Sequence, residues 1–106
     1  MAKCKITVLR RTINEDIVDK YLDDSFKNPT FGLCDHFADD EEFVVEDFDM
    51  PEGFCPWAWA DIQRDVVAIN LGGADFPWMK AKGTAMVCCT DGFRPVIFLI
   101  ERVMDI

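Results

Sequence analysis

Hydrophobic and polar residues alternate in two parts of the chain, and both parts are predicted strands. Alternation puts every second side chain on the same face of a strand, so that one face can be buried. The first strand lies in residues 3–13, KCKITVLRRTI, and its expected buried residues are Cys4, Ile6 and Val8. The second lies in residues 41–48, EEFVVEDF, with Phe43 and Val45 on one face and Val44 and Glu46 on the other.

Two other segments have apolar residues at intervals of three and four, the spacing of a helix with one buried side. The first helix is predicted over residues 15–25, with Asn14 as its N-cap and KNPTFGLC as the segment that ends it. Its apolar stripe is Ile17, Val18, Tyr21 and Leu22. The second helix is predicted from Pro56, which suits the first helical position, to about residue 71, with Cys55 as N-cap. Its expected buried stripe is Trp59, Ile62, Val66 and Ile69, and Gly72-Gly73 ends it.

The sequence TAMVCCTDGFRPVIFLIERV predicts a β-hairpin with strands at residues 84–90 and 93–102, because Asp91-Gly92 is a strong turn signal between two apolar runs. A loop of two residues, or of four from Thr90 to Phe93, pairs Cys89 with Arg94, whereas a loop of three pairs Cys88 with Arg94. We prefer the four-residue loop, since it puts Pro95, which has no N–H to donate, at a non-hydrogen-bonded position.

The order of the predicted elements is β-α-β-α-β-β, with a loop at residues 74–83 before the last two strands. This order indicates an α+β fold with a mostly antiparallel sheet and the tryptophan-bearing helix packed on one face. Neither an internal repeat nor a linker interrupts the sequence, so residues 1–106 are expected to form a single domain.

Length and charge narrow the classes of function. A chain of 106 residues with 20 acidic and 11 basic residues has a formal charge of −9. Binding to a phosphate backbone needs a basic surface, so no nucleic-acid partner is expected. Apolar runs stay well below the ~20 residues of a membrane span, and the start of the chain lacks a signal-peptide pattern. We therefore expect a cytoplasmic protein without a membrane partner; a small molecule, a partner protein and a homodimer all stay open.

Five cysteines are candidates for chemistry. In a reducing compartment they are expected to stay thiols, and an odd number leaves one unpaired in any disulfide scheme. Facing Arg94 across the hairpin at ~4.5–5.5 Å between β-carbons, Cys89 would be stabilised as a thiolate. The alternative is that Cys89 is a packing residue at a strand end. Cys88 points to the other face and is expected to act as a small hydrophobic side chain.

Cys55 is a second candidate, because a thiol at a helix N-terminus lies near unpaired backbone N–H groups. The alternative is a buried thiol under Trp57 and Trp59. If the helix start and the hairpin turn lie at the same end of the sheet, the sulfurs of Cys55 and Cys89 converge. Both are then expected to react with alkylating reagents faster than Cys88.

The segment LCDHF places Cys34 and His36, the chain's only histidine, on one side of an extended strand. Both are soft ligands, so zinc or another soft metal is a candidate cofactor, with Cys55 and Cys89 as the other two ligands. A Cys-x-His pair alone is a weak signal for such a site.

The segments EGFCPWAWADI, LGG, FPWM and CCTDGFRPVIFLIERV together resemble a family of small conserved hypothetical proteins from bacteria and archaea. The resemblance covers nearly the whole chain. It departs at DHFADDE, in place of a proline- and glycine-containing segment, and at a longer KNPTFG. It implies no reaction, but by motif it points to Cys34, Cys55, Trp57, Trp59, Cys89, Asp91, Gly92, Arg94 and Pro95.

Two functions from different classes follow. The first is a cysteine-based site built from Cys55 and Cys89 with Arg94, Asp91 and Trp57, which binds a soft metal or small ligand or carries out thiol redox chemistry. The second is a non-catalytic acidic accessory module that binds a partner protein and uses its cysteines for core packing. The residues do not decide whether the protein is an enzyme.

Overall fold

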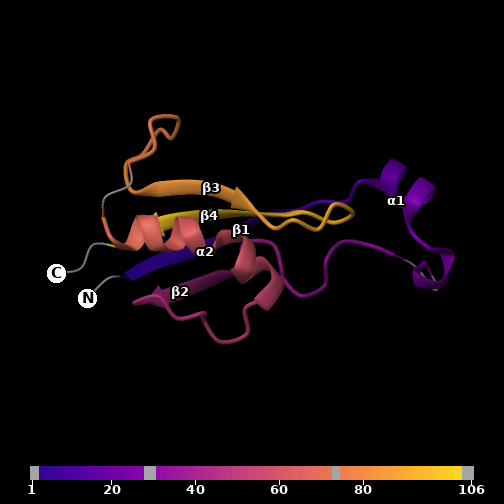
Figure 1. Ribbon diagram of the computed structural model, residues 1–106, viewed down its shortest axis with the longest axis horizontal. Coiled ribbons are helices and arrows are strands. Elements are labelled where there is room, and N and C mark those ends of the chain that lie inside the picture. Colours follow the sequence, from indigo (N-terminus) through magenta and orange to yellow (C-terminus); the bar gives the residue numbers. More distant parts are fainter. Residues whose placement is uncertain (1–2, 28–30, 73–74, 104–106) are drawn as a thin grey trace.

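The computed structural model describes residues 3–27, 31–72 and 75–103, and its centre is a four-stranded antiparallel sheet with one helix packed on it (Figure 1). The sheet order is β2-β1-β4-β3. In chain order the elements are β1 (Lys3–Arg11), α1 (Glu15–Tyr21), the 3-10 turn η1 (Asp24–Phe26), β2 (Glu42–Glu46), α2 (Pro56–Asn70), β3 (Thr84–Cys88) and β4 (Val96–Arg102). The predicted α+β class and its element order are confirmed.

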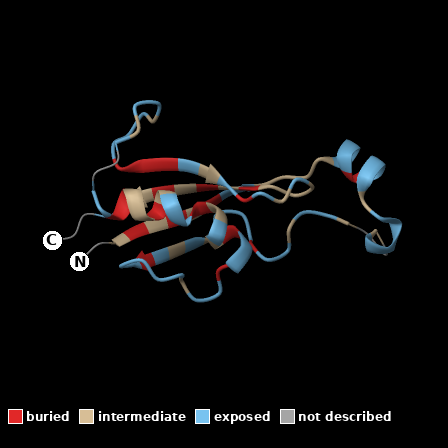
Figure 2. Ribbon diagram, in the orientation of Figure 1, coloured by how far each residue is buried: buried red, intermediate tan, exposed pale blue. Residues whose placement is uncertain are grey.

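The alternating pattern of β1 gives the sheet its buried face. Cys4, Ile6 and Val8 have no exposed surface, whereas the residues between them are partly exposed. On β2, Val45 is buried and Val44 is about half exposed, so this strand also has one inner and one outer face. Figure 2 shows the buried residues gathered where the sheet faces α2.

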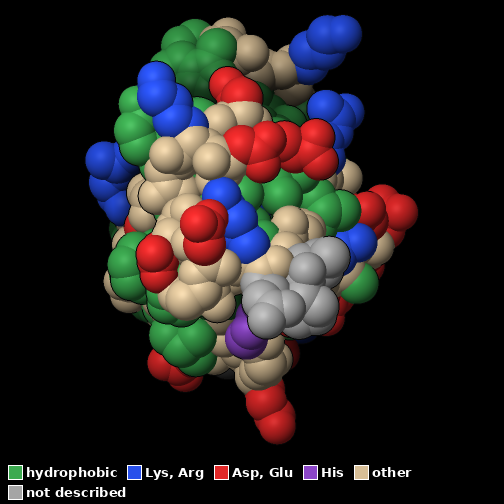
Figure 3. All heavy atoms as spheres, turned by 90° about the vertical axis from the view of Figure 1, so that its right-hand side faces the viewer, with side chains coloured by type: hydrophobic (Ala, Val, Ile, Leu, Met, Phe, Trp, Pro, Cys, Tyr) green, Lys and Arg blue, Asp and Glu red, His purple; other side chains and the backbone are tan. Residues whose placement is uncertain are grey.

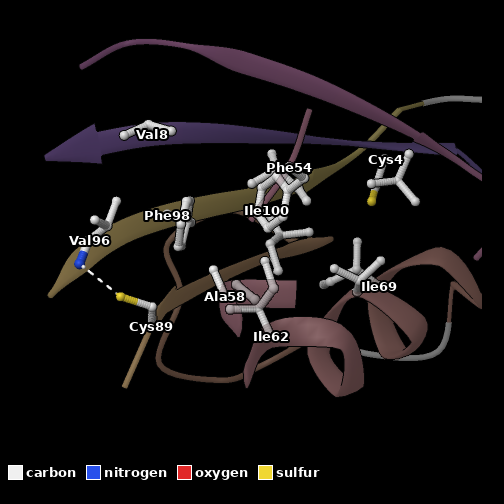
Figure 4. Close-up of a cluster of buried hydrophobic side chains, with 14 of the residues drawn as sticks. Cys4, Val8, Phe54, Ala58, Ile62, Ile69, Cys89, Val96, Phe98 and Ile100 are labelled. Carbon is white, nitrogen blue, oxygen red and sulfur yellow. Dashed lines mark hydrogen bonds between the residues drawn. The ribbon is translucent and has the colours of Figure 1, made fainter. Parts of the chain in front are cut away.

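Helix α2 covers the inner face with the predicted stripe. Ile62, Val66 and Ile69 are fully buried against the sheet, where each contributes roughly 1.5–3 kcal/mol by leaving water (Figure 4). Trp59 differs from the prediction, since it is only partly buried and packs edge-on against Phe54. The helix ends at Asn70, one residue before the predicted end at about residue 71. None of the described helices is long and apolar enough to cross a membrane.

Edge-to-face phenylalanine contacts close one end of the core. Phe37 lies 5.1–5.9 Å from the rings of Phe43, Phe54 and Phe98. Phe37 is 4 % exposed, although it comes from an irregular segment that the sequence did not assign to the core. This ring therefore anchors the segment that carries Cys34 and His36.

Helix α1 differs from its prediction in both length and packing. It ends at Tyr21 instead of residue 25, and only Val18 of its apolar stripe is buried. Tyr21 is 67 % exposed, because α1 lies beyond the end of the sheet and not on its face (Figure 1). Asn14 occupies the N-cap position, but its side-chain amide donates to the Gly92 carbonyl at 2.8 Å and makes no cap bond.

The C-terminal hairpin is present, but its predicted register is wrong. Cys88 pairs with Ile97, which puts Cys89 opposite Val96 and not opposite Arg94. The connection is residues 90–95, two residues longer than expected, since the Asp91 carboxylate accepts the backbone N–H groups of Phe93 and Arg94 and folds a turn around its own side chain.

The end of β1 holds this longer loop in place. Thr12 donates both its N–H, at 3.0 Å, and its hydroxyl, at 2.6 Å, to the Pro95 carbonyl. Asn14 donates its N–H to the Phe93 carbonyl at 2.9 Å. The β1–β4 ladder thus continues past the ends of both strands. Pro95 takes part through its carbonyl oxygen alone, which needs no N–H from the proline.

Candidate functional site

A pocket of about 620 Å³ lies where α2 begins and the hairpin loop ends. Its walls come from residues 34–37, from Cys55, Trp57 and Ala58, and from residues 89–94 and Val96. The pocket is lined by the residues predicted for the cysteine-based site and for the metal site: Cys34, His36, Cys55, Trp57, Cys89, Asp91 and Arg94. Of the further residues that the family motifs indicate, Gly92 lines the pocket, and Trp59 and Pro95 do not. We call it the three-cysteine pocket, after Cys34, Cys55 and Cys89.

Each of the three cysteines is positioned by a different part of the fold. Cys55 is the N-cap of α2, which fixes it at the helix start beside Pro56. Cys89 directly follows β3. The segment of Cys34 is held by Arg11, whose Nη1 donates to the Cys34 carbonyl at 3.3 Å and whose Nε donates to Asp39 at 3.1 Å.

The three thiols differ in access. Cys89 is 8 % exposed and belongs to the hydrophobic core, and its sulfur accepts the Val96 N–H at 3.3 Å (Figure 4). Cys34 and Cys55 are half-buried, and the Cys55 thiol makes no capping hydrogen bond. Cys89 therefore belongs to the pocket wall, and the Cys34 and Cys55 thiols are the ones that a bound molecule can reach.

Arg94 lines the pocket, but its contacts are not those predicted. Its Nε donates to Asp91 at 3.3 Å, and its guanidinium carbon lies 4.5 Å from the centre of the Phe31 ring. Phe31 in turn meets Phe93 edge-on at 6.2 Å. Within the described residues the two Nη atoms of Arg94 make no hydrogen bond, so they are donors that can meet a ligand.

Asp61, in the second turn of α2, and Thr90, in the hairpin loop, connect the start of the helix to the hairpin through hydrogen bonds. Neither residue was predicted from the sequence to belong to the site. The Asp61 carboxylate accepts the Thr90 N–H at 2.8 Å and its hydroxyl at 3.0 Å. Trp57 Nε1 donates to the same hydroxyl at 3.2 Å. A usable signal was present, because residues four apart on a helix share a face and Asp61 follows Trp57 by four.

His36 lies at the rim of the pocket, with its side chain at the surface (purple in Figure 3). Its Nε2 lies 3.2 Å from the Gly53 carbonyl, which can only accept, so Nε2 carries the proton in this contact. The ring also packs edge-on against Phe37.

The predicted metal-ligand set does not assemble. Among residues 3–27, 31–72 and 75–103, no three His, Cys, Asp or Glu side chains lie close enough together to hold a metal ion. Cys34, His36, Cys55 and Cys89 share a pocket, but His36 turns to Gly53 and the Cys89 sulfur is engaged by the backbone. The arrangement thus separates the four ligands that a closed zinc site would need.

The other two cysteines lie outside the pocket. Cys88 is exposed on the outer face of the sheet with Met86, so it faces solvent and is not the packed hydrophobic side chain that was expected. Cys89 is buried and Cys88 is exposed, so access does not favour the predicted faster alkylation of Cys89, which stays a prediction about reaction rates. Cys4 lies in the core, where burial raises the pKa of its thiol to about 11.

No family model, curated protein or solved structure matches the chain. The resemblance to small conserved proteins stays a prediction from motifs.

Proposed function

We propose that the protein binds a small, largely apolar molecule with a soft or electrophilic atom in the three-cysteine pocket. The observation that carries this proposal is that Cys34, Cys55 and Cys89, from three distant parts of the sequence, line one pocket. A thiol is the natural partner of a soft or electrophilic atom. Cys55 is the thiol that engages the ligand, since it is partly exposed and free of a capping bond.

The size and walls of the pocket support an apolar ligand. Pockets of roughly 300–1,000 Å³ hold small molecules, and this one has about 620 Å³. Aromatic and aliphatic side chains form much of its wall, including Phe37, Trp57, Phe93 and Val96. Asp91 offsets the charge of Arg94, so the Nη donors are better suited to orient a hydrogen-bond acceptor than to capture a highly charged anion.

Two further expectations belong to this proposal. The five cysteines are all free, which fits a reducing compartment, and we place the protein in the cytoplasm on that ground. The formal charge of −9 supports a small-molecule or protein partner over a nucleic acid.

An aryl mercurial tests the proposal, because it combines a soft atom with an apolar ring. Phenylmercuric acetate exchanges its acetate for a thiolate and releases acetic acid. In crystals soaked with one equivalent, we expect the strongest anomalous peak at Cys55, with the phenyl ring inside the pocket. Cys88, the exposed thiol on the outer face, is the internal control.

The competing proposal is the acidic accessory module, and one observation favours it: Cys4 and Cys89 are part of the hydrophobic core. A strongest mercury peak at Cys88 would favour that module, because mere exposure would then decide which thiol reacts.

A further inference from the structure

Arg94 is held in the wall of the three-cysteine pocket by two contacts. Its Nε donates to the Asp91 carboxylate at 3.3 Å, and its guanidinium carbon lies 4.5 Å from the centre of the Phe31 ring. Phe31 does not line the pocket, so this ring contacts the guanidinium from outside it. The Arg94 side chain is 30 % exposed, so its two Nη groups are partly desolvated donors that a ligand in the pocket can meet.

The other side-chain N–H donors of the wall are already engaged within the protein. Trp57 Nε1 donates to the Thr90 hydroxyl at 3.2 Å, and His36 Nε2 lies 3.2 Å from the Gly53 carbonyl. Neither nitrogen can turn to a ligand without losing its present contact. Among the lining residues, Arg94 therefore supplies the N–H groups that a ligand must satisfy with an acceptor atom.

The charges of the wall favour a neutral acceptor over an anion. The charged lining residues are one cation and two carboxylates, Arg94 against Asp35 and Asp91. Asp91 is fully engaged, since its Oδ1 accepts the backbone N–H groups of Phe93 and Arg94 and its Oδ2 accepts Arg94 Nε. An anionic ligand would be repelled by both carboxylates, whereas a neutral carbonyl oxygen accepts the same hydrogen bonds without that repulsion.

We propose that the ligand of the three-cysteine pocket is an aryl-substituted conjugated carbonyl compound, and that the Cys55 thiol adds to it. This inference rests on the proposed function, since it takes Cys55 as the reacting thiol. A conjugated carbonyl joins an electrophilic carbon, which a thiol requires, to an acceptor oxygen, which the Arg94 donors require. A soft metal ion would satisfy the thiol but would leave the Arg94 donors without an acceptor.

The reaction is a conjugate addition. The Cys55 thiol gives its proton to solvent, and the thiolate sulfur forms a bond to the β-carbon. The π bond between the α- and β-carbons breaks, and its electron pair moves through the carbonyl to the oxygen, where the Arg94 Nη groups stabilise the enolate. A proton from solvent then adds to the α-carbon and restores the carbonyl. The product is a thioether, and the addition consumes neither an oxidant nor a reductant.

Alkylation rates of the full chain, followed peptide by peptide with mass spectrometry, test the proposal with two reagents that share a phenyl ring. Phenyl vinyl ketone has the conjugated carbonyl, whereas benzyl bromide has an electrophilic carbon and no acceptor oxygen. At Cys55, we expect Arg94→Met to lower the ratio of the phenyl vinyl ketone rate to the benzyl bromide rate by at least about tenfold. General loosening of the pocket changes both rates and therefore cancels in the ratio.

Arg64→Met is the matched control, because Arg64 is highly exposed on α2 and does not line the pocket. It should leave the rate ratio at Cys55 unchanged. The rate ratio at Cys88, the exposed thiol on the outer face, should be the same in the wild type and both variants.

Propiophenone tests the oxygen contact without bond formation, because it keeps the phenyl ring and the carbonyl but lacks the double bond. It should protect Cys55 of the wild type from benzyl bromide, and several-fold more propiophenone should be needed for the same protection in Arg94→Met.

An unchanged Cys55 ratio in Arg94→Met, or equal protection by propiophenone in the wild type and this variant, would overturn the inference. The proposed function would still hold in that case if both reagents alkylated Cys55 faster than Cys88. Faster alkylation of Cys88 by both reagents would overturn the proposed function, and this inference with it.

Discussion

The sulfur of Cys89 accepts a hydrogen bond from the backbone N–H of Val96 at 3.3 Å, and the N–H of Cys89 donates to the Val96 carbonyl at 3.1 Å. This double contact closes the β3–β4 ladder where it lines the three-cysteine pocket. A thiol used in this way is a structural part of the pocket wall, and the proposed ligand contact is assigned to the half-buried thiol of Cys55.

The first prediction concerns that contact. Cys89→Ala removes the acceptor of a buried N–H and some core volume, so it should lower the free energy of unfolding by about 1–2 kcal/mol. Cys88→Ala is the matched control and should change stability by less than about 0.5 kcal/mol, since Cys88 is exposed. Urea denaturation measures both, and equal effects of the two substitutions would show that the Cys89 contact adds nothing.

The second prediction concerns Asp61. Asp61→Ala leaves the Thr90 N–H without its carboxylate partner and loosens the hairpin from α2. We expect the substitution to lower the free energy of unfolding by about 1–2 kcal/mol, as for loss of a hydrogen bond to a charged group. The value is in the lower part of the usual range for such bonds because this contact is exposed. Arg64→Ala, at a highly exposed position on the same helix, is the control and should leave the urea midpoint unchanged.

Periodic sequence patterns predict the elements that bury one face, but they do not predict contacts made by single side chains. Alternation and helical spacing locate β1, β2 and α2, because burial of one face determines where the side chains of these elements must lie. This holds for Cys4, Ile6 and Val8 of β1 and for Ile62, Val66 and Ile69 of α2, whereas Trp59 is only partly buried. The hairpin register was wrong because the Asp91 side chain and the end of β1 build a longer loop, and such side-chain-to-backbone bonds leave no hydrophobic period. The apolar stripe predicted for α1 is mostly not buried for a related reason. The Asn14 side chain donates to the Gly92 carbonyl of the hairpin loop, and α1 lies beyond the end of the sheet and not on its face.

The candidate residues share a pocket because a helix start and a strand end lie at the same end of the sheet, a placement that the predicted topology allowed but did not require. Phe37 and Thr90 were missed since neither follows a periodic pattern. Their roles depend on contacts with residues far away in the sequence, to Phe98 and Asp61 respectively.

The third prediction is the alkaline limit of stability. Burial raises the pKa of Cys4 from 9.0 to about 11, so the folded state holds a proton that the unfolded state releases first. The stabilisation is complete below pH 9.0 and is lost as the pH rises to about 11, by at most about 3 kcal/mol. Cys4→Val lacks this titration, and urea midpoints should fall less with alkaline pH in the variant than in the wild type. Parallel curves for the two proteins would contradict it.

The fourth prediction is an acid dependence at Asp39. Hydrogen bonds from the Arg11 side chain and backbone lower the pKa of Asp39 below its ordinary 3.8. A lowered pKa stabilises the fold above the unfolded value, and this contribution is lost as the pH falls through the folded value. Asp39→Asn should therefore be less stable than the wild type at neutral pH, and the difference should shrink on acidification below pH 3.8. A difference that stays constant with pH would show that the charge of Asp39 plays no part.

The central claim is that the three-cysteine pocket selects its ligand by an apolar shape around the Cys55 thiol. The most direct measurement compares alkylation rates of Cys55 and Cys88 by N-ethylmaleimide and N-phenylmaleimide, followed peptide by peptide with mass spectrometry. Exposure alone predicts that the Cys55 to Cys88 rate ratio is the same for both reagents. Recognition by the pocket predicts a ratio several-fold higher for the phenyl reagent, reduced by Trp57→Ala, which removes part of the wall. A ratio that does not depend on the reagent, in wild type and variant alike, would contradict the account.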